Sequence, residues 1–184
     1  TNGVEGGGNA FNVYRFTRSE LSLPVSDLAY DTVSDRLFAS ATGSASNTLD
    51  AVLELDLART NILRTVVSHL RARRLITAPG GRTLYAIDTD GRLFRLDGND
   101  GLSMKLPLGA DSRGYPFAAN DVALLGMDGS DLIVSAFSDR GEGKLGLWKD
   151  GFVPSLALAN YYGFTLRNGE SPGTLYALGR GTAG

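Results

Sequence analysis

The chain repeats one short apolar motif four times. Each copy places a leucine, and then an aromatic residue or isoleucine, directly after a turn, at residues 36–39, 82–86, 131–134 and 173–177. The leucines are 47, 48 and 43 residues apart, at Leu37, Leu84, Leu132 and Leu175. A period in the forties, filled with short strands and glycine turns, is typical of propeller blades. The repeat therefore predicts an all-β protein, a β-propeller with about four blades' worth of four-stranded antiparallel sheets.

The composition agrees with a protein of many tight turns. Glycine accounts for 24 of the 184 residues, roughly twice its usual share of about 7%. The formal net charge of −2 gives no electrostatic reason to expect a nucleic-acid partner. No apolar run approaches the roughly 20 residues that span a bilayer, so we expect no membrane insertion. The absence of cysteine excludes disulfides and thiolate metal sites.

Each repeat can be divided into four strands, which follow one another from the propeller axis outward. We expect a flexible leader at residues 1–10 and blade sequence from 11 to 184. Whole blades are expected at 25–68, 74–109 and 120–159, with an outer half-blade at 11–23 and an inner half-blade at 161–178. Their strands are expected at 27–30, 36–41, 51–57, 62–67, 75–78, 83–87, 92–96, 103–108, 121–125, 131–137, 144–148, 152–158, 162–166 and 174–178. Segment 51–57 alternates apolar and acidic side chains, which predicts one solvent-facing side.

The two half-blades leave the closure of the propeller open. They can join within one chain to give a four-bladed ring, or between two chains, by strand addition, to give an eight-bladed ring. Alternatively, the chain is one piece of a larger propeller, which we favour because four-bladed rings are uncommon and the last repeat stops early. The chain starts at Thr1 rather than at methionine. Removal of a signal peptide would produce that start, as would proteolysis or a different boundary.

Several segments resemble the blade openings of bacterial YVTN-type propeller proteins. They are SDLAYD at 26–31, DRLFAS at 35–40, APGGRTLYA at 78–86, LPLG at 106–109, NDVA at 120–123 and WKDG at 148–151. The usual SPDGRTLYV of that family has aspartate where this chain has Gly80. The resemblance extends from about Val13 to Ala177 and implies the propeller fold. It also implies an exported protein, in the periplasm, at the cell surface or secreted, because members are mostly surface or periplasmic proteins without an assigned role.

His69 is the only histidine of the chain, and it lies in the basic stretch 68–74 between two expected blades. One interpretation is a general base or a metal ligand at the propeller mouth. The interpretation that we favour is a loop histidine beside arginines. No Gly-x-Ser-x-Gly elbow accompanies His69, so nucleophilic catalysis has little support.

Arginines form the densest positive patch of the chain, at Arg64, Arg71, Arg73 and Arg74. Guanidinium groups suit phosphate and carboxylate. Arg71, Arg73 and Arg74 are therefore candidate residues for binding an anionic partner. The simpler interpretation is a solvated loop face.

Two acidic turns contain the residue types that a calcium loop uses. Asp88 and Asp90 lie in one turn, and Asp97 and Asp100 lie in the other. Carboxylates bind Ca²⁺, but neither turn has the spacing of a known calcium loop. Asp-Gly is also a strong turn signal by itself. We therefore expect no metal and no cofactor, with calcium at these four aspartates as the weaker alternative.

Aromatic residues fall into two groups. One group occupies matching strand positions and is expected to fill the contacts between adjacent blades: Phe38, Tyr85, Phe94, Phe137 and Trp148. The other lies in loops or at strand starts and is a candidate partner-binding surface: Tyr115, Phe117, Tyr161 and Tyr162. Asp27 and Asp121 begin two innermost strands, where we expect their carboxylates to cap backbone amides between blades rather than to hold a ligand.

These observations predict a non-catalytic propeller module outside the cytoplasm. We expect it to bind a protein or a glycan as a scaffold, or to self-associate as an assembly subunit through its terminal half-blades. The alternative is a lactonase-like or other hydrolytic propeller enzyme whose remaining blades are absent here. A propeller fold alone does not decide between these functions.

Overall fold

The structure is a computed structural model, which describes residues 23–43, 50–56, 61–125 and 131–148 in full. For residues 157–159, 162–168 and 175–180 it describes the backbone of three further strands. The expected leader, nearly all of the expected half-blade at 11–23 and most of the expected strand at 152–158 lie outside these residues.

The described strands form three four-stranded sheets and one two-stranded sheet, and each sheet is an antiparallel meander in chain order. The first sheet contains β1 (Val25–Asp31), β2 (Arg36–Ala41), β3 (Ala51–Asp56) and β4 (Asn61–Ser68). The second contains β5 (Ala72–Thr77), β6 (Thr83–Asp88), β7 (Leu93–Asp97) and β8 (Ser103–Leu106). The third contains β9 (Phe117–Leu125), β10 (Asp131–Ser138), β11 (Gly143–Trp148) and β12 (Ala157–Ala159). The fourth contains β13 (Tyr162–Asn168) and β14 (Leu175–Arg180).

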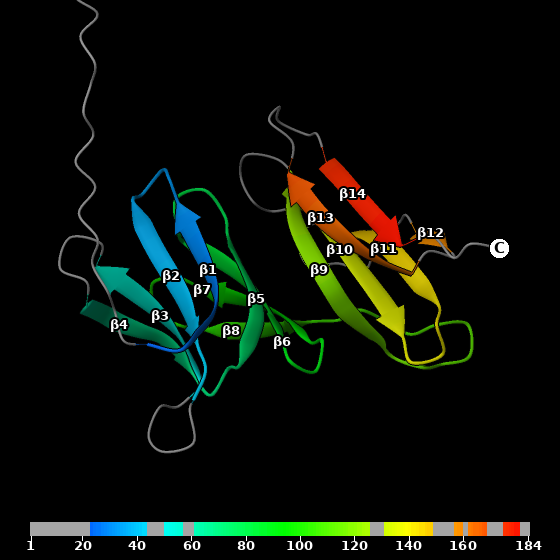
Figure 1. Ribbon diagram of the computed structural model, residues 1–184, viewed down its shortest axis with the longest axis horizontal. Helices are drawn as coiled ribbons and strands as arrows, with labels where there is room; N and C mark the ends of the chain where they lie inside the picture. Colours follow the sequence, from blue (N-terminus) through cyan, green and yellow to red (C-terminus); the bar gives the residue numbers. More distant parts are fainter. Residues whose placement is uncertain are drawn as a thin grey trace, which may run out of the picture.

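The four sheets follow one another in space as they do in sequence. β1 contacts β5, β5 and β6 contact β9, and β13 contacts β9, β10 and β11. Figure 1 shows the first and second sheets together at one end of the molecule and the third and fourth at the other. The innermost strands β1, β5, β9 and β13 are thus consecutive, as they are around the axis of a propeller.

The second sheet is covered on both faces, and β6 shows how. Leu84 packs in one apolar cluster with Phe38 of the first sheet. Tyr85, the next residue, packs in another cluster with Trp148 of the third sheet. Successive side chains of a strand point to opposite faces. One strand therefore supplies both interfaces, and its residues 84–87 are at most 3% exposed.

The aromatic residues expected between blades lie there, with one exception. Phe38 and Trp148 are fully buried, Tyr85 is nearly so, and Phe94 packs against the first of the two clusters. The expectation for Phe137 is wrong, because its side chain is 37% exposed. It lies one residue from the end of β10, on the face opposite that of Val134.

The expectation of a solvent-facing side on β3 is also wrong. Glu54 is 6% exposed, and it shares the buried face with Val52, which is 0% exposed. The first sheet packs this face against the second sheet, so the acidic side chain lies at an interface between blades. The alternation of apolar and acidic residues predicted the strand but not its surroundings.

Most strand bounds agree with the sequence to within a residue or two, and the differences have local causes. β5 begins at Ala72 and β9 at Phe117, three and four residues before the expected starts. Each of these strands has an irregular register near its start, which the repeat pattern does not reveal. β8 ends at Leu106, before Pro107, because proline has no amide to donate to the ladder.

Because each sheet is a meander, the connections between strands lie alternately at two opposite ends of the molecule. At one end lie the links between sheets and the turns between second and third strands. We name this end the loop rim and define it by residues 69–71, 89–92, 107–116 and 139–142. The turns between first and second and between third and fourth strands lie at the other end.

Candidate functional site

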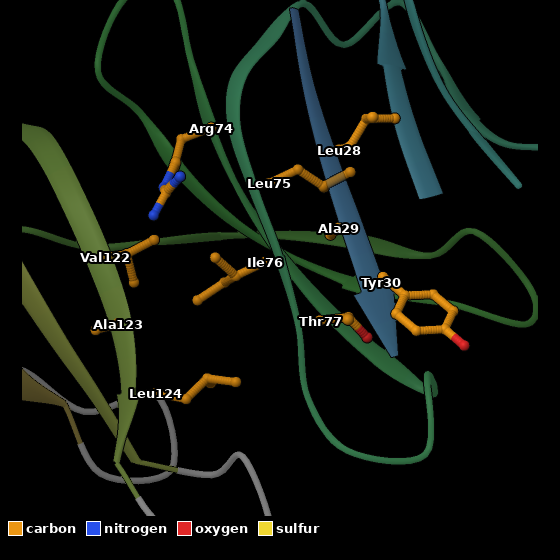
Figure 2. A pocket seen from close by; sticks show the side chains of 10 residues that line it. All are labelled: Leu28, Ala29, Tyr30, Arg74, Leu75, Ile76, Thr77, Val122, Ala123 and Leu124. Atoms are coloured by element: carbon orange, nitrogen blue, oxygen red, sulfur yellow. The ribbon is translucent and has the colours of Figure 1, made fainter. Parts of the chain in front are cut away.

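Three of the innermost strands, β1, β5 and β9, line a groove of about 360 Å³. Figure 2 shows Ile76 of β5 pointing toward Val122 and Leu124 of β9, with Arg74 above them. Arg74 is the only side chain among the residues lining this groove that carries a formal charge at neutral pH. The groove is therefore suited to contacting apolar groups, and it brings no nucleophile and base together among the residues that line it.

A line of alternating charges crosses the start of the innermost strands. Asp27, Arg74 and Asp121 are 47 residues apart and occupy equivalent positions in β1, β5 and β9. Arg74 Nε donates to Asp121 Oδ1 at 3.0 Å, and Arg74 Nη1 lies 3.8 Å from Asp27 Oδ2. The backbone amide of Leu75 donates to Asp27 Oδ2 at 2.7 Å. The prediction that Asp27 caps an amide of the neighbouring blade is thus confirmed. Asp121 Oδ1 accepts a hydrogen bond of 2.9 Å from the backbone amide of Val122 as well as the bond from Arg74 of the preceding blade.

Glu54 holds two arginines that clamp the first sheet to the second. Arg36 donates two hydrogen bonds of 2.8 Å to the carboxylate, and Arg64 donates one of 2.8 Å. The same two guanidinium groups donate to the carbonyl of Gly98 in the second sheet. The hydrogen bonds from Arg36 are the main cause that lowers the pKa of Glu54 below its usual range, against the opposing effect of burial. The clamp is a structural contact between blades.

Tyr115, one of the candidate aromatic residues, lies on the loop rim between the second and third sheets. Tyr115 is 37% exposed, and the guanidinium of Arg140 stacks 4.8 Å from the centre of its ring. Arg140 Nη2 also donates to the Tyr115 hydroxyl at 3.2 Å. On the same loop, the Ser112 hydroxyl donates to Glu142 Oε1 at 2.5 Å. Two side-chain pairs therefore tie the β8–β9 connection to the β10–β11 turn.

Asp111 shapes the loop that presents Tyr115. Its Oδ1 atom accepts hydrogen bonds from the amides of Arg113 and Tyr115, at 2.9 and 2.8 Å. Its own amide donates to the Tyr115 carbonyl at 2.8 Å. These hydrogen bonds to Asp111 hold the short loop in one conformation, so that it presents its aromatic side chain at low entropic cost.

Phe117 begins β9 beside a cavity of about 580 Å³ between the second and third sheets. Apolar residues form much of the wall: Leu93, Leu106, Pro107, Leu108, Pro116 and Phe117. Lys144 lies 4.0 Å from the centre of the Phe117 ring and donates to the Leu108 carbonyl at 2.6 Å. Burial lowers the pKa of Lys144. The cavity has the size of a site for one large side chain or a small ligand. Its accessible apolar groups come from Phe117, Pro107 and Pro116, because Leu93, Leu106 and Leu108 are already buried.

The arginines proposed to bind an anion do not act as one patch. Arg64 belongs to the Glu54 clamp, Arg74 pairs with Asp121, and Arg73 Nη2 donates to the Ala119 carbonyl at 2.6 Å. Arg71 is exposed and contacts no carboxylate within the described parts of the chain. It lines a cavity of about 390 Å³ between the first and second sheets together with the exposed His69.

The four aspartates considered for calcium lie at two opposite ends of the second sheet. Asp88 accepts hydrogen bonds from the amides of Asp90 and Arg92 in the β6–β7 turn, at 3.0 and 2.8 Å. Asp97 accepts a hydrogen bond of 2.7 Å from the amide of Asn99 in the β7–β8 turn. The structure does not bring the two turns together, and no group of three or more metal-ligating side chains is found in the part of the chain that it describes. The carboxylates Asp88 and Asp97 organise turns.

For two of the candidate aromatic residues the structure gives no side chain, and two charged residues of the loop rim were not predicted from the sequence as site residues. Tyr161 lies outside the described residues, and only the backbone of Tyr162, the first residue of β13, is described. Arg140 and Glu142 were not predicted, because a turn of mixed charge carries no pattern of its own. Their pairing with Tyr115 and Ser112 depends on the folding of the third sheet, which brings its β10–β11 turn to the connection that leads into β9.

Comparison with known proteins identifies the fold. No protein-family model matches the chain, and no curated protein matches it. Among solved structures, the chain is similar to the β-propeller domain of Myceliophteria thermophila Cps50 (Swd1), with 14% identity and a TM-score of 0.63 over 84% of this chain and 48% of that one. It is also similar to Kuenenia stuttgartiensis hydrazine synthase, with 12% identity and a TM-score of 0.51 over 85% of this chain and 55% of that one.

These similarities confirm the predicted fold class, an all-β partial β-propeller. The chain spans about half the length of both solved structures. The described residues also include no helix of the length and apolar character needed to cross a membrane. At these identities the likeness extends to the fold and no further.

Proposed function

We propose that this chain is a non-catalytic β-propeller module that binds a partner protein at its loop rim. The partner inserts one large apolar side chain into the 580 Å³ cavity between the second and third sheets. Tyr115 and Arg140 contact the partner at the border of that cavity. This proposal narrows the protein or glycan partner expected from the sequence to a protein.

The cavity beside Phe117 is the observation that carries the proposal. Interfaces commonly consist of a buried apolar or aromatic anchor surrounded by polar contacts. Here the accessible apolar groups of Phe117, Pro107 and Pro116 are bordered by exposed charged side chains, namely Asp90, Arg92, Lys105 and Asp139. Tyrosine and arginine are the residue types enriched at the centre of such interfaces. Their stacking fixes both side chains before a partner arrives, which lowers the entropy lost on binding.

The proposed location is outside the cytoplasm. The resemblance to exported propeller proteins supports that location, and the absence of cysteine is compatible with any compartment. The non-catalytic role is supported by the central groove, where Arg74 is the one formally charged lining side chain and is already paired with Asp121. A hydrolytic propeller is the competing function.

The experiment screens the purified chain on a displayed random-peptide library, on a glycan array and against a panel of lactone and ester substrates. We expect peptides with a shared aromatic or large aliphatic anchor, bound with micromolar affinity. Tyr115→Ala and Arg140→Ala should each weaken those peptides about tenfold, as interface tyrosines and arginines commonly do. Tyr30→Ala, which removes another exposed tyrosine from a distant face, is the matched control and should bind normally.

Two results would contradict the proposal. Binding restricted to glycans would replace the protein partner with a carbohydrate. Hydrolysis of a lactone or an ester with a specific activity that stays constant through further purification would establish the competing enzymatic function.

A further inference from the structure

The cavity between the first and second sheets has a volume of about 390 Å³, within the size range of small-molecule sites. The link between these sheets lines it with four consecutive residues, 68–71, and the β6–β7 turn lines it with Asp88, Thr89 and Arg92. Four consecutive residues of an extended strand could not all face one side. The φ of His69, +62°, turns the chain so that they do.

The acidic groups that line this cavity already hold donors of the protein. Asp88 accepts hydrogen bonds from the amides of Asp90 and Arg92, and from Arg92 Nε at 2.5 Å. Asp50 accepts a hydrogen bond of 2.9 Å from the amide of Gly43. Arg92 Nη2 lies 2.8 Å from Asp90 Oδ2, so this arginine is paired with two carboxylates. The charges of Asp88 and Arg92 are therefore balanced within the β6–β7 turn.

Arg71 is the other arginine of the lining, and its guanidinium is not committed to the protein. The side chain is exposed and pairs with no carboxylate in the part of the chain that the structure describes. Its backbone is fixed, because the Arg71 carbonyl accepts a hydrogen bond of 3.2 Å from the amide of Thr89. A guanidinium on a fixed backbone beside a cavity is prepared to bind one negative charge.

The uncommitted groups of the lining favour a ligand with one carboxylate and several hydroxyl groups. One guanidinium matches one negative charge, and its planar fork pairs with both oxygens of a carboxylate. A doubly charged phosphate would be repelled by Asp50 and Asp88, which line the same cavity. The hydroxyl groups of Ser68, Thr89 and Ser103 also line it, and among the described residues they form no side-chain hydrogen bond. They can therefore pair with hydroxyl groups of a ligand.

We infer that this cavity binds a small hydroxylated carboxylate, a sugar acid, with Arg71 paired to the carboxylate. The exposed ring of His69, two residues away, supplies a further hydrogen-bond donor. Of the three arginines expected from the sequence to bind an anion, Arg71 is thus the one that does so. The site does not depend on the proposed partner site, since Arg92 is the one residue that lines both cavities.

The test follows the backbone amide signals of the isotope-labelled chain by NMR during titration with glucuronate. We expect saturable binding with a dissociation constant of about 1 mM or below. Signals of residues 69–71 and 89–92 should shift, whereas those of the β8–β9 connection, 107–116, should not. Glucose has the same ring without the carboxylate, and inorganic phosphate has the charge without the ring. Each should bind at least about tenfold more weakly than glucuronate.

Substitutions at Arg71 locate the carboxylate. Arg71→Gln removes the cation and should weaken glucuronate binding at least about tenfold, and Arg71→Lys, which keeps the charge without the fork, should have a smaller effect. The matched control is Arg113→Gln, because Arg113 is an exposed arginine that lines neither cavity. All three variants should have the melting temperature of the wild type, which separates loss of binding from loss of folding.

Three results would overturn the inference. Glucuronate that shifts no signal at about 20 mM would exclude the ligand class. Binding that tolerates Arg71→Gln would place the ligand elsewhere. Glucose or phosphate that binds as tightly as glucuronate would show that the cavity does not recognise a hydroxylated carboxylate. Failure of the proposed partner site would look different, because Tyr115→Ala should weaken peptides and leave glucuronate binding unchanged.

Discussion

Asp27 in β1 accepts a hydrogen bond of 2.7 Å from the backbone amide of Leu75 in β5, 48 residues further along the chain. The bond joins the innermost strands of two adjacent blades. Arg74, the neighbour of Leu75, pairs with Asp121 in the third blade at 3.0 Å. Contacts at equivalent repeat positions thus connect three blades in one line.

The first prediction concerns this line of charges. Arg74→Met keeps the volume of the side chain and removes the cation between Asp27 and Asp121. We expect a loss of about 1 kcal/mol in the free energy of unfolding, because Arg74 is 38% exposed and solvent screens part of the interaction. Arg71→Met is the control, three residues away on an exposed link, and should change stability by less than about 0.5 kcal/mol. Equal losses in urea unfolding would show that Arg74 contributes nothing specific.

The second prediction is a pH dependence that Glu54 contributes. Two arginines lower the pKa of Glu54 in the folded protein below its usual 4.5. The unfolded state therefore binds more protons than the folded state near that value, and the stabilising contribution, present at neutral pH, is lost as the pH falls through the folded pKa. Glu54→Gln should cost about 2 kcal/mol at pH 7.

Urea titrations of the wild type and Glu54→Gln between pH 7 and pH 3 measure this contribution. The difference in stability should shrink as the pH falls below about 4.5. Asp31, Asp97 and Asp111 also have lowered pKa values and act on both proteins alike, so they cancel in the difference. A difference that stays constant with pH would mean that the ionised carboxylate is not what the clamp requires.

The third prediction tests how closely the first two blades approach. Gly101 has a φ of +75°, and a Cβ atom there would lie 1.9 Å from the carbonyl oxygen of Val66 in β4. Gly101→Ala should therefore cost about 3 kcal/mol, since backbone must move. Gly114→Ala, at a φ of +86° in open space, should cost only the conformational penalty of about 1 kcal/mol. Similar melting temperatures for the two variants would contradict the close packing of β4 against the β7–β8 turn.

The fourth prediction concerns His69, which has a φ of +62° in the link between the first two sheets. Glycine reaches this conformation without steric cost, and branched residues do so poorly. His69→Gly should be at least as stable as the wild type, and His69→Val should be less stable by about 1 kcal/mol. Thermal unfolding of the three proteins decides the question, and a stabilising valine would rule out the left-handed backbone at this position.

Much of the fold could be predicted because the repeated pattern of apolar residues and turns marks the buried strands of each blade. β2 has the bounds expected from its sequence, Arg36–Ala41, because buried strands between good turns leave little freedom. β5 was predicted too short, because Arg73 and Arg74 in its first half resemble a polar loop. Their charges are satisfied by Ala119 and Asp121 of the next blade, and only tertiary structure supplies those partners.

The candidate site was harder to predict than the fold. Tyr115 and Phe117 stood out as aromatic residues near turns. The structure places Phe117 in the lining of the cavity and Tyr115 next to Pro116, another lining residue. Arg140, in the β10–β11 turn, stacks on Tyr115, and Lys144 of β11 stacks on Phe117. These partners are about 25 residues apart in sequence and meet only when β9, β10 and β11 pair, which no local pattern encodes. Burial of Glu54 was missed for the same reason.

The central claim is that the second sheet is enclosed between the first and the third. Residue-resolved amide hydrogen exchange in dilute solution measures this most directly. The account predicts that amides of residues 84–87 in β6 exchange more slowly than those of residues 61–65 in β4, by at least about tenfold, because both faces of β6 are covered whereas most side chains of this part of β4 are exposed. Exchange in β6 as fast as in β4 or faster would contradict the stacked arrangement of the blades.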